Sequence, residues 1–182
     1  RELEEARERI KELLEEIKDE VRRWREKIKR LLEDSRRKAE RLKEDIKRLL
    51  EEIKKLSDDG RLDERIEERL RRELERIKRE LEKYRKELEE DTRRDEERLR
   101  KIKEDLDERM RDIRRELKER VTDEDALRDI ERLLREVDDA FRRLVEELRR
   151  LNEEVHRTTD ELIREVEDML RKVEEALKRE KD

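Results

Sequence analysis

Ser35, Asp95 and His156 are the three residue types of a hydrolase triad, in which a base activates a hydroxyl nucleophile. If the predicted helices are aligned at their turns, Ser35 lies level with residue 83 and His156 lies level with residue 91 of the second helix. Eight residues of helix are about 12 Å long, which is too far for a hydrogen bond between nucleophile and base. We therefore expect no catalytic residues and no enzyme activity, and we interpret these side chains as structural.

The segment Glu153-x-x-His156 matches half of the signature of di-iron helical bundles. That site needs two such motifs and two further carboxylates, but the chain has a single histidine. Trp24, Tyr84 and Phe141 could line a ligand pocket, although ordinary core packing is the favoured interpretation. With one glycine, the chain has no glycine-rich loop for phosphate. We expect no metal site and no cofactor.

Several polar residues fall at positions where the apolar pattern calls for a core side chain. Ser35 lies between Ile17 and Ile53 at intervals of eighteen residues, and Asp95 lies between Ile77 and Ile113 in the same way. Buried polar groups cost free energy unless they are paired. We therefore predict a structural polar network with seven members: Trp24, Ser35, Thr92, Asp95, Asn152, His156 and Thr159.

The helix alignment brings most of this network to one layer. Asp95 lies level with Asn152 and with Trp24, and Thr92 lies beside His156. We expect Asp95 to accept hydrogen bonds from Asn152, His156 or the Trp24 indole N–H, and Thr92 to donate a second bond. Such a network penalises other registers, because a slip would leave every member without its partner.

The elements that position these residues are three long helices. In the first, apolar residues recur every eighteen residues, as in Ile10, Ile28 and Ile46, and eighteen residues make five turns of a straight α-helix. Breaks at Ser57-Asp58-Asp59-Gly60 and at Thr122-Asp123-Glu124-Asp125 separate three apolar stripes. The pattern predicts helices at about 2–57, 61–121 and 123–180, in an all-α, antiparallel up-down-up three-helix bundle with 1–182 as a single domain.

Composition excludes several classes of function. Asp, Glu, Lys and Arg make up 65% of the 182 residues, and 57 basic and 62 acidic residues are finely mixed, so no basic face for nucleic acid exists. No apolar run approaches the roughly 20 residues of a membrane span, and Arg1-Glu2-Leu3-Glu4 is not typical of a targeting signal. No second apolar stripe demands an oligomer. We expect a soluble, very stable monomer that requires no partner, nucleic acid or membrane.

The eighteen-residue stripe, the Glu/Lys/Arg surface, the absence of Pro and Cys, and the polar core layer resemble those of de novo designed helical bundles with a buried hydrogen-bond network. The resemblance covers the whole chain. It implies a structural scaffold without natural biochemical activity, in which the polar layer specifies helix pairing. The alternative that it implies is an interaction or switch module that exchanges a helix with a partner.

Overall fold

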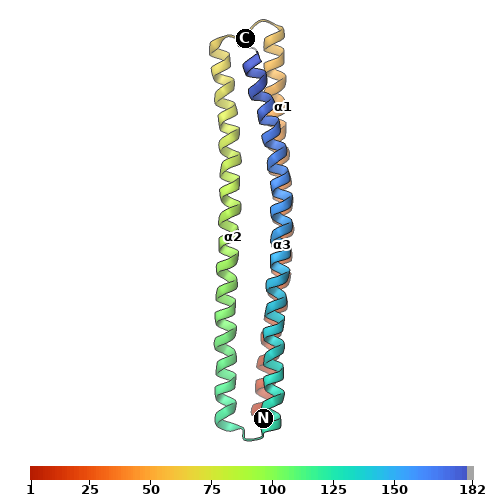
Figure 1. The fold of residues 1–182 in the computed structure, drawn as a ribbon, viewed down its shortest axis with the longest axis vertical. Coiled ribbons are helices and arrows are strands. Elements are labelled where there is room, and N and C mark those ends of the chain that lie inside the picture. The colour runs from red at the N-terminus through yellow and green to blue at the C-terminus, as the bar shows by residue number, and fades with distance from the viewer. Residues whose placement is uncertain (180–182) are drawn as a thin grey trace. The chain divides into compact units, whose positions relative to one another are not determined.

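A computed structural model describes residues 1–179 of the chain. They form three helices, α1 (Glu2–Asp58), α2 (Glu64–Arg120) and α3 (Glu124–Arg179), joined by two short connections (Figure 1). The all-α three-helix architecture predicted from the apolar stripes is confirmed, and the helix bounds agree with the predicted ones within three residues. The predicted end of the third helix at residue 180 lies outside the described residues.

The connection between α1 and α2 is built around the only glycine of the chain. Gly60 has a φ of 67°, in the left-handed region that side chains with a Cβ disfavour. The Gly60 N–H donates to the Ser57 carbonyl at 3.1 Å, and the Arg61 N–H donates to the Leu56 carbonyl at 2.9 Å. This pair of bonds is the Schellman motif, which satisfies carbonyls that the end of a helix would leave without donors.

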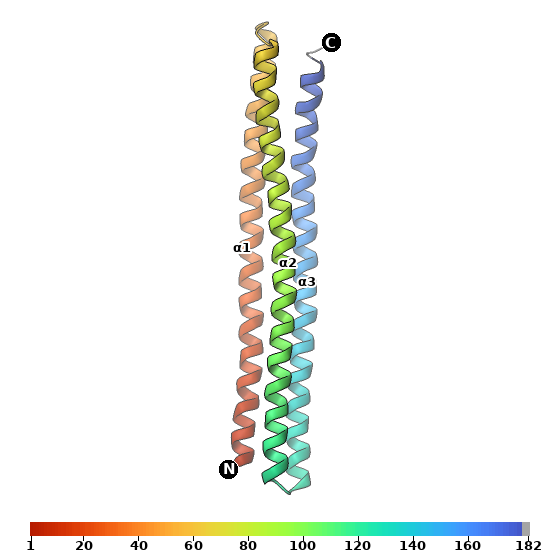
Figure 2. The same ribbon diagram turned by 90° about the vertical axis from the view of Figure 1, so that its left-hand side faces the viewer.

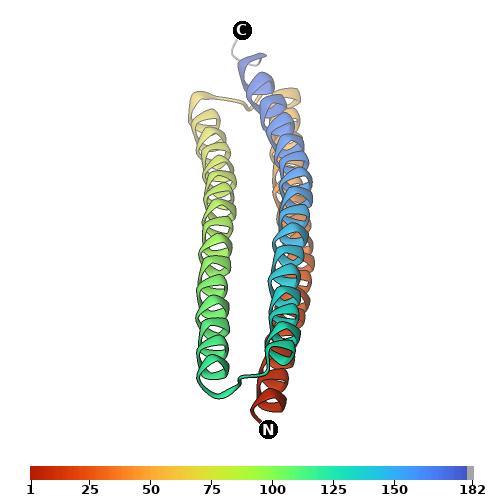
Figure 3. The same ribbon diagram turned by 60° about the horizontal axis from the view of Figure 1, so that its bottom comes forward.

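Aspartates begin the two following helices. The Asp63 carboxylate accepts a hydrogen bond from the Ile66 N–H at 2.9 Å, and the Asp123 carboxylate accepts one from the Asp125 N–H at 3.1 Å. Each side chain therefore caps N–H groups that lack a partner within the helix. Because Asp63 is the cap, α2 begins at Glu64 and not at residue 61. Figure 3 shows both connections.

The helices divide into two compact units, and each helix contributes a segment to both. Unit 1 comprises Arg1–Ile28 and Asp91–Glu153, and unit 2 comprises Lys29–Glu90 and the chain from Glu154 onward. Within each unit the α2 segment runs antiparallel to the α1 and α3 segments (Figure 2). The assignment of 1–182 to a single domain stays a prediction.

Each unit has its own apolar core, drawn from the predicted stripes of all three helices. In unit 1 the most deeply buried side chains include Leu13, Ile113 and Leu134. In unit 2 they include Ile46, Leu70 and Val173. No large hydrophobic side chain is exposed among residues 1–179, and no helix in that range combines the length and apolar character that a membrane crossing requires. The remaining helix faces carry charge, so the apolar stripes alone account for the packing.

Candidate functional site

Asp95 of α2 is the buried carboxylate of unit 1, with 6% of its surface exposed. Its Oδ1 accepts a hydrogen bond from Lys27 Nζ of α1 at 2.6 Å, although the lysine side chain is itself 45% exposed. The lysine reaches inward past Trp24, and its ammonium lies 5.3 Å from the centre of the indole ring. Burial raises the pKa of Asp95, and the bond from Lys27 offsets part of that increase.

This pairing corrects the partners expected for Asp95. The structure gives Asp95 the Lys27 ammonium in place of the Trp24 indole, and the buried Trp24 Nε1 has no hydrogen-bond partner among residues 1–179. Asn152 of the same unit is half-buried, and no hydrogen bond joins it to Asp95 in the described part of the chain. An ammonium on a long flexible side chain makes a charge-assisted bond, which is stronger than a bond from a neutral donor.

Ser35 and Tyr84 form the polar pair in the core of unit 2. Ser35 on α1 and Tyr84 on α2 are 1% and 8% exposed, and the Tyr84 hydroxyl donates a hydrogen bond to Ser35 Oγ. The Lys38 ammonium lies 5.2 Å from the centre of the tyrosine ring. Burial raises the pKa of Tyr84, and the bond to Ser35 opposes that increase. Tyr84 was not among the predicted polar residues, although the helix alignment placed Ser35 level with residue 83.

The hydrogen bonds of Thr159 stay within one helix. Thr159 is buried, and its hydroxyl donates to the carbonyls of Val155 at 2.7 Å and His156 at 3.3 Å, within its own helix. Thr92 is half-buried. His156 is exposed, so its inclusion in a buried network is wrong. Its positional equivalents eighteen residues away, Asp138 and Glu174, are both charged and indicated that exposure.

The triad chemistry considered for Ser35 and His156 has no geometric basis in unit 2. The Ser35 hydroxyl is bonded to Tyr84, and no hydrogen bond joins it to His156 in the described part of that unit. Within residues 1–179, no group of three or more His, Cys, Asp or Glu side chains is placed to hold a metal ion.

A surface groove lies between α1 and α2 in unit 1 and has a volume of about 820 Å³. Apolar atoms of Ile17, Ile102 and Leu106 form part of its lining, together with charged residues of both helices. Polar and charged side chains thus surround a small apolar floor. Sequence reasoning missed this groove, because it depends on the separation of two helices and not on any residue pattern.

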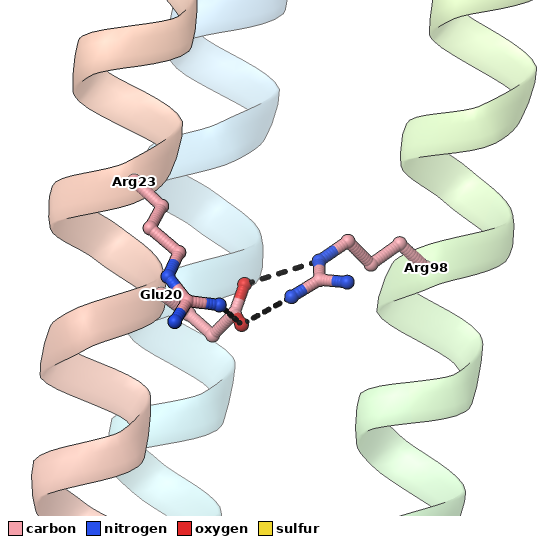
Figure 4. Close-up of polar contacts among 3 residues, drawn as sticks. All are labelled: Glu20, Arg23 and Arg98. Carbon is pink, nitrogen blue, oxygen red and sulfur yellow. Dashed lines mark hydrogen bonds and ion pairs between the residues drawn. The ribbon is translucent and has the colours of Figure 1, made fainter.

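Glu20 of α1 and Arg98 of α2 form the main ion pair of this groove. The Glu20 carboxylate accepts two hydrogen bonds from the Arg98 guanidinium, at 2.6 and 3.3 Å, and one from Arg23 at 3.5 Å (Figure 4). The bidentate contact joins α2 to α1, and Glu20 is only 13% exposed. The hydrogen bond with Glu20 raises the pKa of Arg98.

Comparisons with known proteins bear on the fold. No protein-family model and no curated protein matches the chain. A solved structure described as a computationally designed three-helix bundle is similar to it, with a TM-score of 0.50 and 20% sequence identity over 98% of this chain and 96% of that chain. At this identity the likeness establishes the fold: the chain folds as a three-helix bundle.

Proposed function

We propose that this chain is a designed structural scaffold with no natural biochemical activity, and that its buried polar pairs specify how α1 and α2 meet. The observation that carries the proposal is the presence of one such pair in each unit, Lys27–Asp95 in unit 1 and Ser35–Tyr84 in unit 2. Both pairs join the same two helices. The eighteen-residue apolar repeat and the likeness to a designed bundle support the designed origin.

The energetics of these pairs favour a role in specificity over one in stability. A buried polar group adds little to stability compared with an apolar group of the same shape, but separation of the partners leaves the buried Asp95, Ser35 and Tyr84 side chains without a hydrogen bond. Rotation or slippage of α1 against α2 would separate both pairs. An apolar core alone penalises such movements less, because one leucine or isoleucine contact resembles another.

The test is to replace both pairs with apolar side chains of similar shape, in a variant carrying K27M, S35A, Y84F and D95L. We expect its melting temperature to equal or exceed that of the unmodified chain. The sole tryptophan gives one indole N–H signal in a ¹⁵N–¹H correlation spectrum. We expect that signal to be single in the unmodified chain, and split or broadened in the variant because alternative helix packings become populated.

The matched control carries the same number of changes in exposed ion pairs between α1 and α2. Arg9–Glu116 lies in unit 1 and Glu52–Arg69 lies in unit 2, so the control carries R9M, E52Q, R69M and E116Q. It should keep one sharp indole signal. A single sharp signal from the core variant at undiminished stability would show that the buried pairs do not specify helix pairing.

A further inference from the structure

The carboxylates that line the groove of unit 1 are all engaged by cations. Glu20 is paired with Arg98 and Arg23. The other four are paired as follows: Glu16 and Asp105 with Arg109, Asp19 with Arg22, and Glu97 with Arg100. The negative charge that faces the groove is therefore neutralised by neighbouring side chains.

Two cations of the groove have no such partner. The side chains of Arg93 and Lys101 form no ion pair or hydrogen bond with any of residues 1–179. Both are exposed residues of α2 that line the groove, and they lie eight residues apart, about two helical turns. Arg94, between them in sequence, has only a distant contact with Asp91 at 3.9 Å. The α2 side of the groove thus presents two cations that form no ion pair, one on either side of Glu97.

The apolar floor lies beside these cations. Ile17 and Leu106 are buried and Ile102 is half-buried, and all three line the same groove. A volume of about 820 Å³ falls within the roughly 300–1,000 Å³ of small-molecule sites. Free cations next to an apolar floor match a ligand that has one acidic group and an apolar body.

We propose that this groove binds small amphipathic organic anions, with the apolar body against Ile102 and the sulfonate or carboxylate beside the Arg93 or the Lys101 side chain. This binding is separate from the scaffold role, because none of these residues belongs to the buried pairs. Both cations provide long-range attraction, and the one beside the acidic group donates a charge-assisted hydrogen bond. The floor provides apolar contact, which a freely hydrated inorganic anion could not use.

The experiment compares two fluorescent probes with the same ring system. 1-Anilinonaphthalene-8-sulfonate carries the acidic group, and N-phenyl-1-naphthylamine lacks it. Both are titrated against the full chain, the variant R93Q/K101Q and the control R36Q/R37Q. Arg36 and Arg37 are exposed cations that do not line the groove, so the control makes the same change in net charge. Helical circular dichroism checks that all three proteins are folded.

We expect saturable binding of the sulfonate at one site, and dissociation constants about fivefold higher in R93Q/K101Q, as two exposed charge contacts imply. The control should bind the sulfonate as the unmodified chain does, and the neutral probe should not distinguish the three proteins. The proposal is overturned if the sulfonate does not bind saturably, if both double variants weaken it equally, or if the neutral probe weakens to the same extent.

Discussion

Asp95 is the only charged side chain among the buried residues of the described chain, and its environment predicts a specific dependence on pH. Burial raises its pKa above the 3.8 of an unperturbed aspartate, despite the bond from Lys27. The folded state therefore binds a proton more tightly than the unfolded state does. It follows that this residue lowers the free energy of unfolding as pH rises from 3.8 through the raised pKa.

The variant Asp95→Asn isolates this effect, because it keeps the shape of the side chain and removes the titration. In urea denaturation, the free energy of unfolding of the unmodified chain should fall relative to that of the variant as pH rises from 3.8 through the raised pKa of Asp95. Above that pKa, the difference in free energy between the two proteins should be constant. A gain of stability relative to Asp95→Asn over the same window would mean that Lys27 outweighs burial.

His156 tests the corrected network at the same scale. Its side chain is exposed on α3, and its backbone carbonyl, not its imidazole, accepts from Thr159. Substitutions of exposed side chains outside helix caps and buried hydrogen-bond networks change stability little. His156→Gln should therefore alter the free energy of unfolding by less than about 0.5 kcal/mol. A loss above about 2 kcal/mol in urea denaturation would restore His156 to a buried network.

The polar positions were predictable at the residue scale, but their partners were not. Ser35 and Asp95 are evident because each interrupts a repeat of isoleucines. Lys27 occupies an ordinary exposed position, and only its long side chain brings its ammonium to Asp95. The spacing of residues along a helix does not predict where the end of a long, flexible side chain lies. Tyr84 could have been predicted as the partner of Ser35, because the helix alignment placed Ser35 level with residue 83, next to the only tyrosine of the chain.

At the scale of elements, Gly60 shows how one residue ends a helix. Its φ of 67° is the only positive value in the described chain, and a Cβ added there would have no atom within 4 Å. Any cost of substitution is therefore conformational and not steric. Gly60→Ala should destabilise the chain by about 1–2 kcal/mol in urea denaturation.

Gly60→Asn is the matched control, because asparagine tolerates the left-handed conformation better than alanine does. It should cost clearly less than Gly60→Ala. Equal losses from the two variants would indicate that the side chain itself, and not the backbone conformation, disturbs the connection between α1 and α2.

The helices themselves were largely encoded in local sequence. Apolar spacing indicates their number and faces, the short connections indicate their antiparallel direction, and the breaks that contain Gly60 and Asp123 lie at their ends. Local sequence does not decide which aspartate caps α2, because Asp59 and Asp63 both precede it closely. Both can accept from backbone N–H groups, and the structure selects Asp63 because Asp59 lies within the Schellman turn that ends α1.

At the scale of the whole molecule, each helix runs through both compact units without a break in its hydrogen-bonded backbone. Unfolding of one unit should therefore disrupt the helices of the other. Trp24 fluorescence reports on unit 1, whereas circular dichroism reports on all helices. We expect one cooperative thermal transition above about 70 °C, as idealised bundles are typically hyperstable, with the same midpoint by both probes. Separate midpoints would mark two domains.

The central claim is that one chain supplies all three helices of its bundle. Its described surface exposes no large hydrophobic side chain that a second copy would need to cover. Light scattering coupled to size-exclusion chromatography at micromolar concentration measures this directly. The result we predict is a single species of 23.0 kDa, the mass of the monomer. A stable species of twice that mass would contradict the claim that a single chain forms the complete, monomeric bundle.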